Sequence, residues 1–174
     1  MTTAVAPSAA TAAQVAVSWT PELELHEPHI DATHREFVDL LNSLHELVNA
    51  EVATQGQLLE ALDGLITHTE AHFGMEERWM AAVGFAPENC HSRQHTLVLD
   101  VLREVRKHVE AGKDLDPVRR LPTELGQWFG FHAEAMDAAL VYTMQQAGYD
   151  PATGQCARPP LGEAQSGCGS SGCS

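Results

Sequence analysis

Histidines recur along this chain at spacings that could hold metal ions. The 174 residues include ten histidines. His72 and Glu76 are four residues apart, as are His91 and His95, so on a helix each pair would lie about 40° apart on one face. Imidazole and carboxylate are ligands that iron, zinc and copper accept. The pairs indicate a metal site, although each spacing alone also occurs in surface ion pairs and in satisfied core histidines.

Two further histidines lie next to apolar positions. His34 precedes the apolar stripe that begins at Phe37, and His132 follows Trp128 by four residues. Burying these imidazoles without partners would cost about 1–3 kcal/mol each, a cost that metal coordination would offset. The joint pattern therefore predicts a metal site inside a helical core. Asp137 follows His132 by five residues, about 140° around an ideal helix, so spacing alone does not bring both to one metal.

Four segments with an apolar helical period must position these side chains. Gly56 is expected in the first turn between them, and Asp31 is a plausible N-cap for the first helix. The predicted helices run from Asp31 to about Ala53, from about Gln57 to Val83, from after Pro87 to about Gly112, and from after Pro117 or Pro122 to about Gly148. Strand-like alternation is missing. Long helices with short loops predict an all-α fold, an antiparallel up-down-up-down four-helix bundle.

The composition of the two ends suggests a single domain between flexible tails. Residues 19–149 form the expected helical domain, residues 1–18 are low in complexity and expected to be disordered, and residues 150–174 form a flexible Gly/Ser/Cys-containing tail. The tail holds Cys156, Cys168 and Cys173. Their spacing matches no C-x-x-C zinc pattern, so incidental thiols are favoured over a metal or redox site.

The charge balance argues against several classes of partner. Lys and Arg number 10 against 24 Asp and Glu, giving a formal charge of -14. So acidic a surface repels phosphate backbones, which disfavours nucleic acid and anionic membranes. The N-terminus lacks the basic start of a secretory signal, and no apolar run approaches the roughly 20 residues of a membrane span. A cytoplasmic monomer is expected.

Taken in order, the motifs resemble those of a hemerythrin, specifically a bacterial hemerythrin. The resemblance covers about Trp19 to Gly148. All seven ligand positions of that family have a matching residue type at the matching spacing. The matching motifs are His34 in IDATH, H-F-x-x-E-E from His72, H-x-x-x-H from His91, and W-x-x-x-H-x-x-x-x-D from Trp128 to Asp137.

The resemblance implies a non-haem centre of two iron ions. His91, His95 and His132 would hold one iron, and His34 and His72 the other. Glu76 and Asp137 would bridge the irons together with an oxo or hydroxo group. The second iron would keep one open position, where dioxygen would bind reversibly for storage, delivery or sensing, so that an oxygen-binding protein is expected rather than an enzyme.

The ligand types fit reversible binding. Ferritin-like di-iron oxidases use mainly carboxylates, whereas five histidines leave only two anionic ligands here. Less donated charge should make further reaction of bound oxygen harder. Apolar side chains near the ligands could form a dry pocket or be plain core packing; they are Phe37, Phe73, Trp128, Phe129 and Met136.

The chain departs from the family just before its first helix. Thr33 stands where Gln or Glu is usual. His26 and Glu27 stand where a glycine and an apolar residue are usual, and His29 follows. A solvated loop is the favoured reading. Alternatively, one of these residues reaches the site and closes the open position or relays protons, which would make the protein a peroxidase, catalase-like enzyme or oxidase. His68, one turn before His72, could likewise lie beside the ligands or simply at the surface. A third hypothesis is an iron or redox regulator that acts through the tail cysteines.

Overall fold

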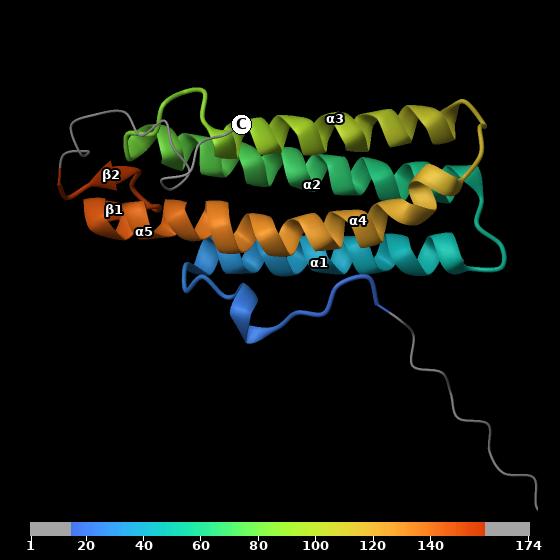
Figure 1. Ribbon diagram of the computed structural model, residues 1–174, viewed down its shortest axis with the longest axis horizontal. Helices are drawn as coiled ribbons and strands as arrows, with labels where there is room; N and C mark the ends of the chain where they lie inside the picture. The colour runs from blue at the N-terminus through green and yellow to red at the C-terminus, as the bar shows by residue number, and fades with distance from the viewer. Residues whose placement is uncertain (1–14, 159–174) are drawn as a thin grey trace, which may run out of the picture.

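Four helical stretches run back and forth along one axis (Figure 1). The computed structural model describes residues 15–158. The first three stretches are α1 (Pro28–Asn49), α2 (Gln55–Ala82) and α3 (Cys90–Glu110). The fourth is α4 (Asp116–His132), continued by the π-helical turn η2 (Ala133–Asp137) and by α5 (Ala138–Ala147). The predicted all-α antiparallel four-helix bundle is confirmed.

Helix α1 begins three residues before the predicted start. Glu27 is its N-cap, with a side chain that accepts a hydrogen bond from the Ile30 backbone N–H at 2.8 Å. Pro28 follows in the first turn, where a missing N–H costs nothing. The prediction that Asp31 caps the helix is wrong, because its carboxylate instead accepts from the Leu25 backbone N–H at 2.8 Å.

Helices α2 and α3 both begin with a capping box. Thr54 and Gln57 exchange side-chain and backbone hydrogen bonds at the start of α2, and Asn89 and Ser92 do the same at the start of α3. Each box satisfies two N–H groups that have no partner within the helix. Gly56, expected in the turn, therefore lies inside the first turn of α2.

The apolar core is divided into two clusters along the bundle axis. The larger cluster includes Leu41, Leu62 and Leu102. The smaller one includes Ile30 and Leu140 and lies toward the other end of the bundle. On α1, α2 and the fourth helical stretch, buried histidines or carboxylates occur between the residues of one cluster and those of the other. The core is thus interrupted by one polar layer.

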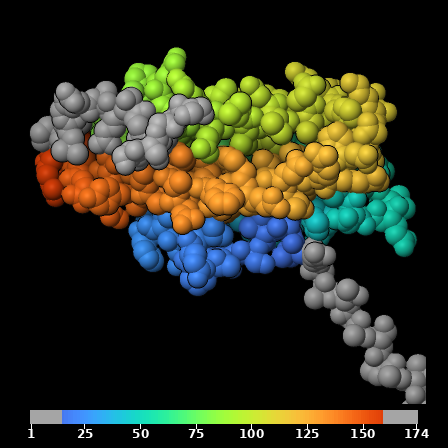
Figure 2. All heavy atoms as spheres, viewed as in Figure 1, coloured from blue at the N-terminus to red at the C-terminus, as the bar shows by residue number. Residues whose placement is uncertain are grey.

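The segment before α1 lies along the bundle and includes the short 3-10 helix η1 (Pro21–Leu23). The Asn42 side chain accepts from the backbone N–H groups of Ala16 and Val17, at 2.9 and 3.0 Å, and donates to the Val17 carbonyl at 2.9 Å. Figure 2 shows α4 and α5 as the central band of one face, with the N-terminal segment below and α3 above.

The start of the predicted C-terminal tail is folded. Gly148 ends α5 with a φ of 58°. The strands β1 (Tyr149–Asp150) and β2 (Gln155–Cys156) then form a two-stranded antiparallel hairpin. The rest of the two expected tails, residues 1–14 and 159–174, lies outside the described residues, and so do Cys168 and Cys173. None of the described helices has an apolar stretch long enough to cross a membrane.

Candidate metal centre

Glu76 lies at the middle of the polar layer and faces histidines from two helices. Its Oε2 is 3.2 Å from Nε2 of His91 and 3.1 Å from Nε2 of His95. Its Oε1 is 3.4 Å from Nε2 of His72, one turn earlier on α2. The two oxygens of one carboxylate therefore face different histidines.

Asp137 repeats this arrangement from the other side of the layer. Its Oδ1 is 3.0 Å from Nε2 of His91 and 3.2 Å from Nε2 of His132, and its Oδ2 is 3.2 Å from Nε2 of His34. Each carboxylate thus directs one oxygen toward a three-histidine group and the other toward a two-histidine group. The three-histidine group is His91, His95 and His132, and the two-histidine group is His34 and His72.

The π-helical turn η2 explains how Asp137 reaches this layer. The backbone N–H of Ala138 donates to the carbonyl of Ala133, a hydrogen bond across five residues. Such a turn contains one residue more than an α-helical turn, so His132 and Asp137 come to the same side of the helix. The 140° separation expected on an ideal α-helix does not apply here.

The seven side chains are deeply buried and lack ordinary partners. Their exposure ranges from 0% for Glu76 and Asp137 to 6% for His72. Among the described residues, both oxygens of each carboxylate and Nε2 of His34, His91, His95 and His132 have no hydrogen-bond partner. Buried polar atoms that converge without partners are costly. Imidazole nitrogens and carboxylate oxygens in this arrangement fit a pair of cations.

Burial and mutual charge shift the protonation of the layer. Burial lowers the pKa of His72 to about 3 and, with help from His91 and His132, that of His95 to about 2. Burial also lowers the pKa of His132. These three imidazoles are neutral at neutral pH, which leaves a ring nitrogen free to bind a metal.

The two carboxylates and His91 shift one another's pKa values. Burial, with the nearby Asp137, raises the pKa of Glu76 to about 7. Burial would lower the pKa of His91, but the carboxylates of Asp137 and Glu76 outweigh it and raise that pKa to about 9. Burial would likewise raise the pKa of Asp137, but His132, His34 and His91 hold it well below its ordinary range.

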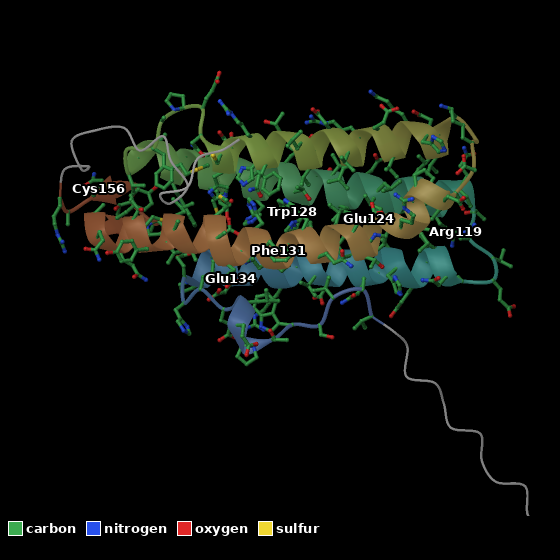
Figure 3. The ribbon with its side chains drawn as sticks, in the orientation of Figure 1. Arg119, Glu124, Trp128, Phe131, Glu134 and Cys156 are labelled. Atoms are coloured by element: carbon green, nitrogen blue, oxygen red, sulfur yellow. The ribbon has the colours of Figure 1, made fainter. Side chains whose placement is uncertain are left out.

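Side chains behind the layer contact the outer nitrogens of two histidines. Nδ1 of His132 lies 2.9 Å from Oε1 of Gln94, which also accepts from Nε1–H of Trp128 at 3.2 Å. Figure 3 labels Trp128 on α4, where the helix faces α3. Nδ1 of His72 lies 3.0 Å from Oγ1 of Thr33. Such contacts orient a metal-binding imidazole.

Gln94 was missed in the sequence because its role depends on a contact between two helices. It lies within the H-x-x-x-H motif of α3, but its partners are on α4. A glutamine next to two candidate ligands carries no spacing signal of its own.

Aromatic rings cover the polar layer on the side of the larger apolar cluster. Phe73 stacks on His95 with ring centroids 3.8 Å apart and planes 5° apart. Phe129 meets His34 edge to face at 5.0 Å and also contacts Phe37, and Trp128 stacks on His132 at 4.4 Å. These rings belong to the core and also contact the candidate ligands. Core packing is thus observed, and the dry pocket stays a prediction.

The contacts found for Glu27 and His29, at the start of α1, do not involve the seven residues. Glu27 caps α1 and lies 3.0 Å from Nδ1 of His29, whose side chain is 57% exposed and meets Trp79. His26 is exposed, with a φ of 59°. These contacts favour the reading of this loop as a structural, solvated one.

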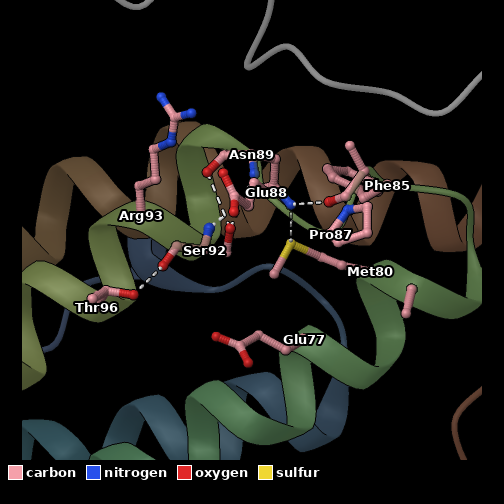
Figure 4. Close-up of a pocket in the computed structure, with 11 residues that line it drawn as sticks. Glu77, Met80, Phe85, Pro87, Glu88, Asn89, Ser92, Arg93 and Thr96 are labelled. Atoms are coloured by element: carbon pink, nitrogen blue, oxygen red, sulfur yellow. Dashed lines mark hydrogen bonds between the residues drawn. The ribbon is translucent and has the colours of Figure 1, made fainter.

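Two cavities lie beside the layer. One of about 670 Å³ between α2 and α3 includes Glu77, Met80 and Ser92 (Figure 4). Glu77 is half-exposed, and its Oε1 lies 3.5 Å from Nδ1 of His95. The other, a groove of about 740 Å³ on α1 and α2, includes Thr33, His68 and His72. His72 is the one residue of the seven that lines either cavity.

Comparison with known proteins agrees with this geometry. The family model described as the hemerythrin HHE cation binding domain matches residues 27–142. A bacteriohemerythrin of Ralstonia nicotianae is 38% identical over 134 residues, which cover 77% of this chain and 93% of the relative. A bacteriohemerythrin of Stenotrophomonas maltophilia is 30% identical over 122 residues, 70% of this chain and 76% of the relative. The chain belongs to the hemerythrin HHE cation-binding domain family, as the order of its motifs predicted.

Proposed function

We propose that the protein holds two iron ions and binds dioxygen reversibly. The observation that carries the proposal is the position of the two carboxylates. Each of Glu76 and Asp137 has one oxygen near the three-histidine group and the other near the two-histidine group. Carboxylates placed this way would bridge two metal ions. The three-histidine group would complete one iron, and the two-histidine group would leave the other with one fewer ligand.

Iron bound here would supply the electrons that dioxygen takes up reversibly. The protein would hold the ligands in place, exclude water and limit proton entry. The ligands are at most 6% exposed, and the rings of Phe73 and Phe129 contact His95 and His34. Five imidazoles, which would be neutral once bound to metal, and two carboxylates also donate less charge than a carboxylate-rich site. Both features favour release of unchanged dioxygen.

His68 supports a second candidate, an enzyme that consumes peroxide or reduces dioxygen. Its ring is 6.4 Å from that of His72, and both line the groove on α1 and α2. Burial lowers the pKa of His68, so a neutral ring could accept a proton there. Neither ring nitrogen has a hydrogen-bond partner among the described residues. Replacing His68 with Leu would abolish turnover in this case and leave reversible binding unchanged in the first.

The deciding experiment is anaerobic loading with ferrous iron, followed by repeated exposure to oxygen and vacuum. A visible charge-transfer band that appears with oxygen and disappears under vacuum over several cycles is expected. Immediate and irreversible oxidation would contradict reversible binding and favour the enzyme. The variant His72→Leu should lose the band, whereas His108→Gln, which changes a histidine paired with Asp114 at the surface, should keep it.

The remaining hypotheses are not tested by the described residues. Of the tail cysteines, Cys156 is described, and its thiol donates to the Ala82 carbonyl at 3.5 Å. The regulatory role, the cytoplasmic location and the monomeric state stay predictions.

A further inference from the structure

The amide of Gln94 has only one orientation that suits both of its partners. The indole N–H of Trp128 can donate a hydrogen bond but cannot accept one. It lies 3.2 Å from the Gln94 amide atom that it shares with His132. That atom must therefore be the carbonyl oxygen, because the alternative orientation would place an NH₂ group against the indole N–H.

The orientation of this amide determines where His132 carries its proton. The carbonyl oxygen of Gln94 only accepts, so Nδ1 of His132, 2.9 Å away, must be the protonated nitrogen. In a neutral ring Nε2 then carries the lone pair. This nitrogen lies 3.2 Å from Oδ1 of Asp137, inside the layer. The lone pair is thus directed to the place where a metal would bind.

Ring packing restrains Trp128 in its contact with Gln94. Trp128 stacks on His132 with planes 27° apart and meets Phe73 edge to face at 6.2 Å. The other members of the three-histidine group differ. Among the described residues, Nδ1 of His91 has no hydrogen-bond partner, and Nδ1 of His95 lies 3.5 Å from Oε1 of the half-exposed Glu77 without a hydrogen bond.

We propose that Trp128 and Gln94 form a relay that fixes the tautomer of His132 and thereby sets the metal affinity and reduction potential of the three-histidine side. Trp128 orients Gln94, and Gln94 orients and polarises His132. Both act as positioning residues without touching the metal. The relay rests on the proposed function, since it requires a metal at His132.

The test compares three variants of the full chain by anaerobic titration with ferrous iron against a coloured chelator. Gln94→Leu removes the acceptor and should weaken iron binding about 10- to 100-fold. Trp128→Phe keeps a stacked ring but removes the N–H, so a smaller loss is expected. Gln94→Glu keeps an acceptor of the same shape and should retain the affinity. Arg93→Leu, an exposed neighbour on α3, is the control and should change nothing.

Reduction potentials distinguish the relay from loss of packing. A charged acceptor makes the imidazole a stronger donor and stabilises ferric iron, so Gln94→Glu should lower the potential. Gln94→Leu should raise it. Shifts in the same direction, or none, would overturn the relay even if one variant folded poorly. Wild-type protein that takes up fewer than two irons would instead overturn the proposed function itself.

Discussion

At the scale of single residues, Thr33 stands where the family resemblance led us to expect a glutamine or glutamate, and its short side chain contacts His72. Its hydroxyl lies 3.0 Å from the carbonyls of His29 and Ile30, to which it can donate, and 3.0 Å from Nδ1 of His72. A hydroxyl that donates to the helix has its lone pairs left to accept from His72. A short side chain can therefore orient the imidazole of His72, a candidate ligand on the two-histidine side.

Removing this hydroxyl should weaken iron binding. Thr33→Val keeps the shape of the side chain but leaves Nδ1–H of His72 without its acceptor, so a loss of about 10-fold or more in affinity for ferrous iron is expected. Thr33→Ser should restore it. Thr96→Val is a matched control, because Thr96 makes the same hydroxyl contact to the carbonyl four residues earlier, on the exposed face of α3. An equal loss in both valine variants would contradict the role of Thr33.

At the scale of elements, the π-helical turn is the feature that the sequence did not reveal. The H-x-x-x-x-D spacing contradicted a shared site on an ideal helix, and only the family resemblance brought His132 and Asp137 together. The packing of the helices on both sides of η2 selects the π rather than the α hydrogen-bond pattern. No local sequence pattern encodes that packing.

Deleting one residue within this turn should preserve the site. Without Ala135, which is exposed, His132 and Asp137 would be four apart and face the same side of a regular α-helix. The variant should take up two irons per chain, measured by iron analysis after gel filtration. Deleting the exposed Gln127 of α4 instead rotates Leu121 and Leu125 out of the core and should unfold the bundle. Loss of iron in the Ala135 deletion with the helices intact would contradict this account of η2.

Other parts of the elements followed directly from the sequence. The apolar period predicted four antiparallel helices, and the i,i+4 pairs placed Glu76 beside His72 and His95 beside His91. Helix ends were less predictable. Glu27 and Asp31 are both acidic, so residue type alone does not say which of them caps α1. The position of Pro28 and the path of the preceding segment select Glu27.

Gly126 allows the N-terminal segment to lie against α4. A Cβ at this position would come within 2.4 Å of Val17 Cγ2 and 3.3 Å of the Ala16 carbonyl oxygen. Gly126→Ala should therefore displace the segment, destabilise the protein by about 1–3 kcal/mol and expose residues 15–25 to limited proteolysis. Gly130→Ala on the same helix has open space around its Cβ and should stabilise the helix by about 0.5–1 kcal/mol. Similar proteolysis in both variants would contradict the contact.

At the scale of the whole molecule, the polar layer links stability to pH. Its groups act in opposite directions once metal is removed. Glu76, with a folded pKa of about 7, and His91, with one of about 9, bind protons more readily in the folded chain than in the unfolded chain. His72 and His95, with values of about 3 and about 2, do the reverse. The two apolar clusters on either side contain no such groups and contribute a constant background.

The metal-free protein should be most stable near pH 6.5 and lose stability in acid. Below that pH the unfolded chain protonates His72 and His95, whose ordinary pKa is 6.5, while the folded chain does not. Glu76 offsets one of these protons down to about its ordinary pKa of 4.5, whereas His132, whose pKa burial also lowers, adds to the loss. The loss is therefore on the order of 1–3 kcal/mol per pH unit at first and steeper below that point. Urea midpoints of chelator-treated protein between pH 8 and pH 4 measure this curve. His95→Gln removes one of the protons and should flatten the acid limb. A midpoint that stays constant from pH 6 to pH 4 in the unmodified chain would mean that these imidazoles are not held neutral by burial.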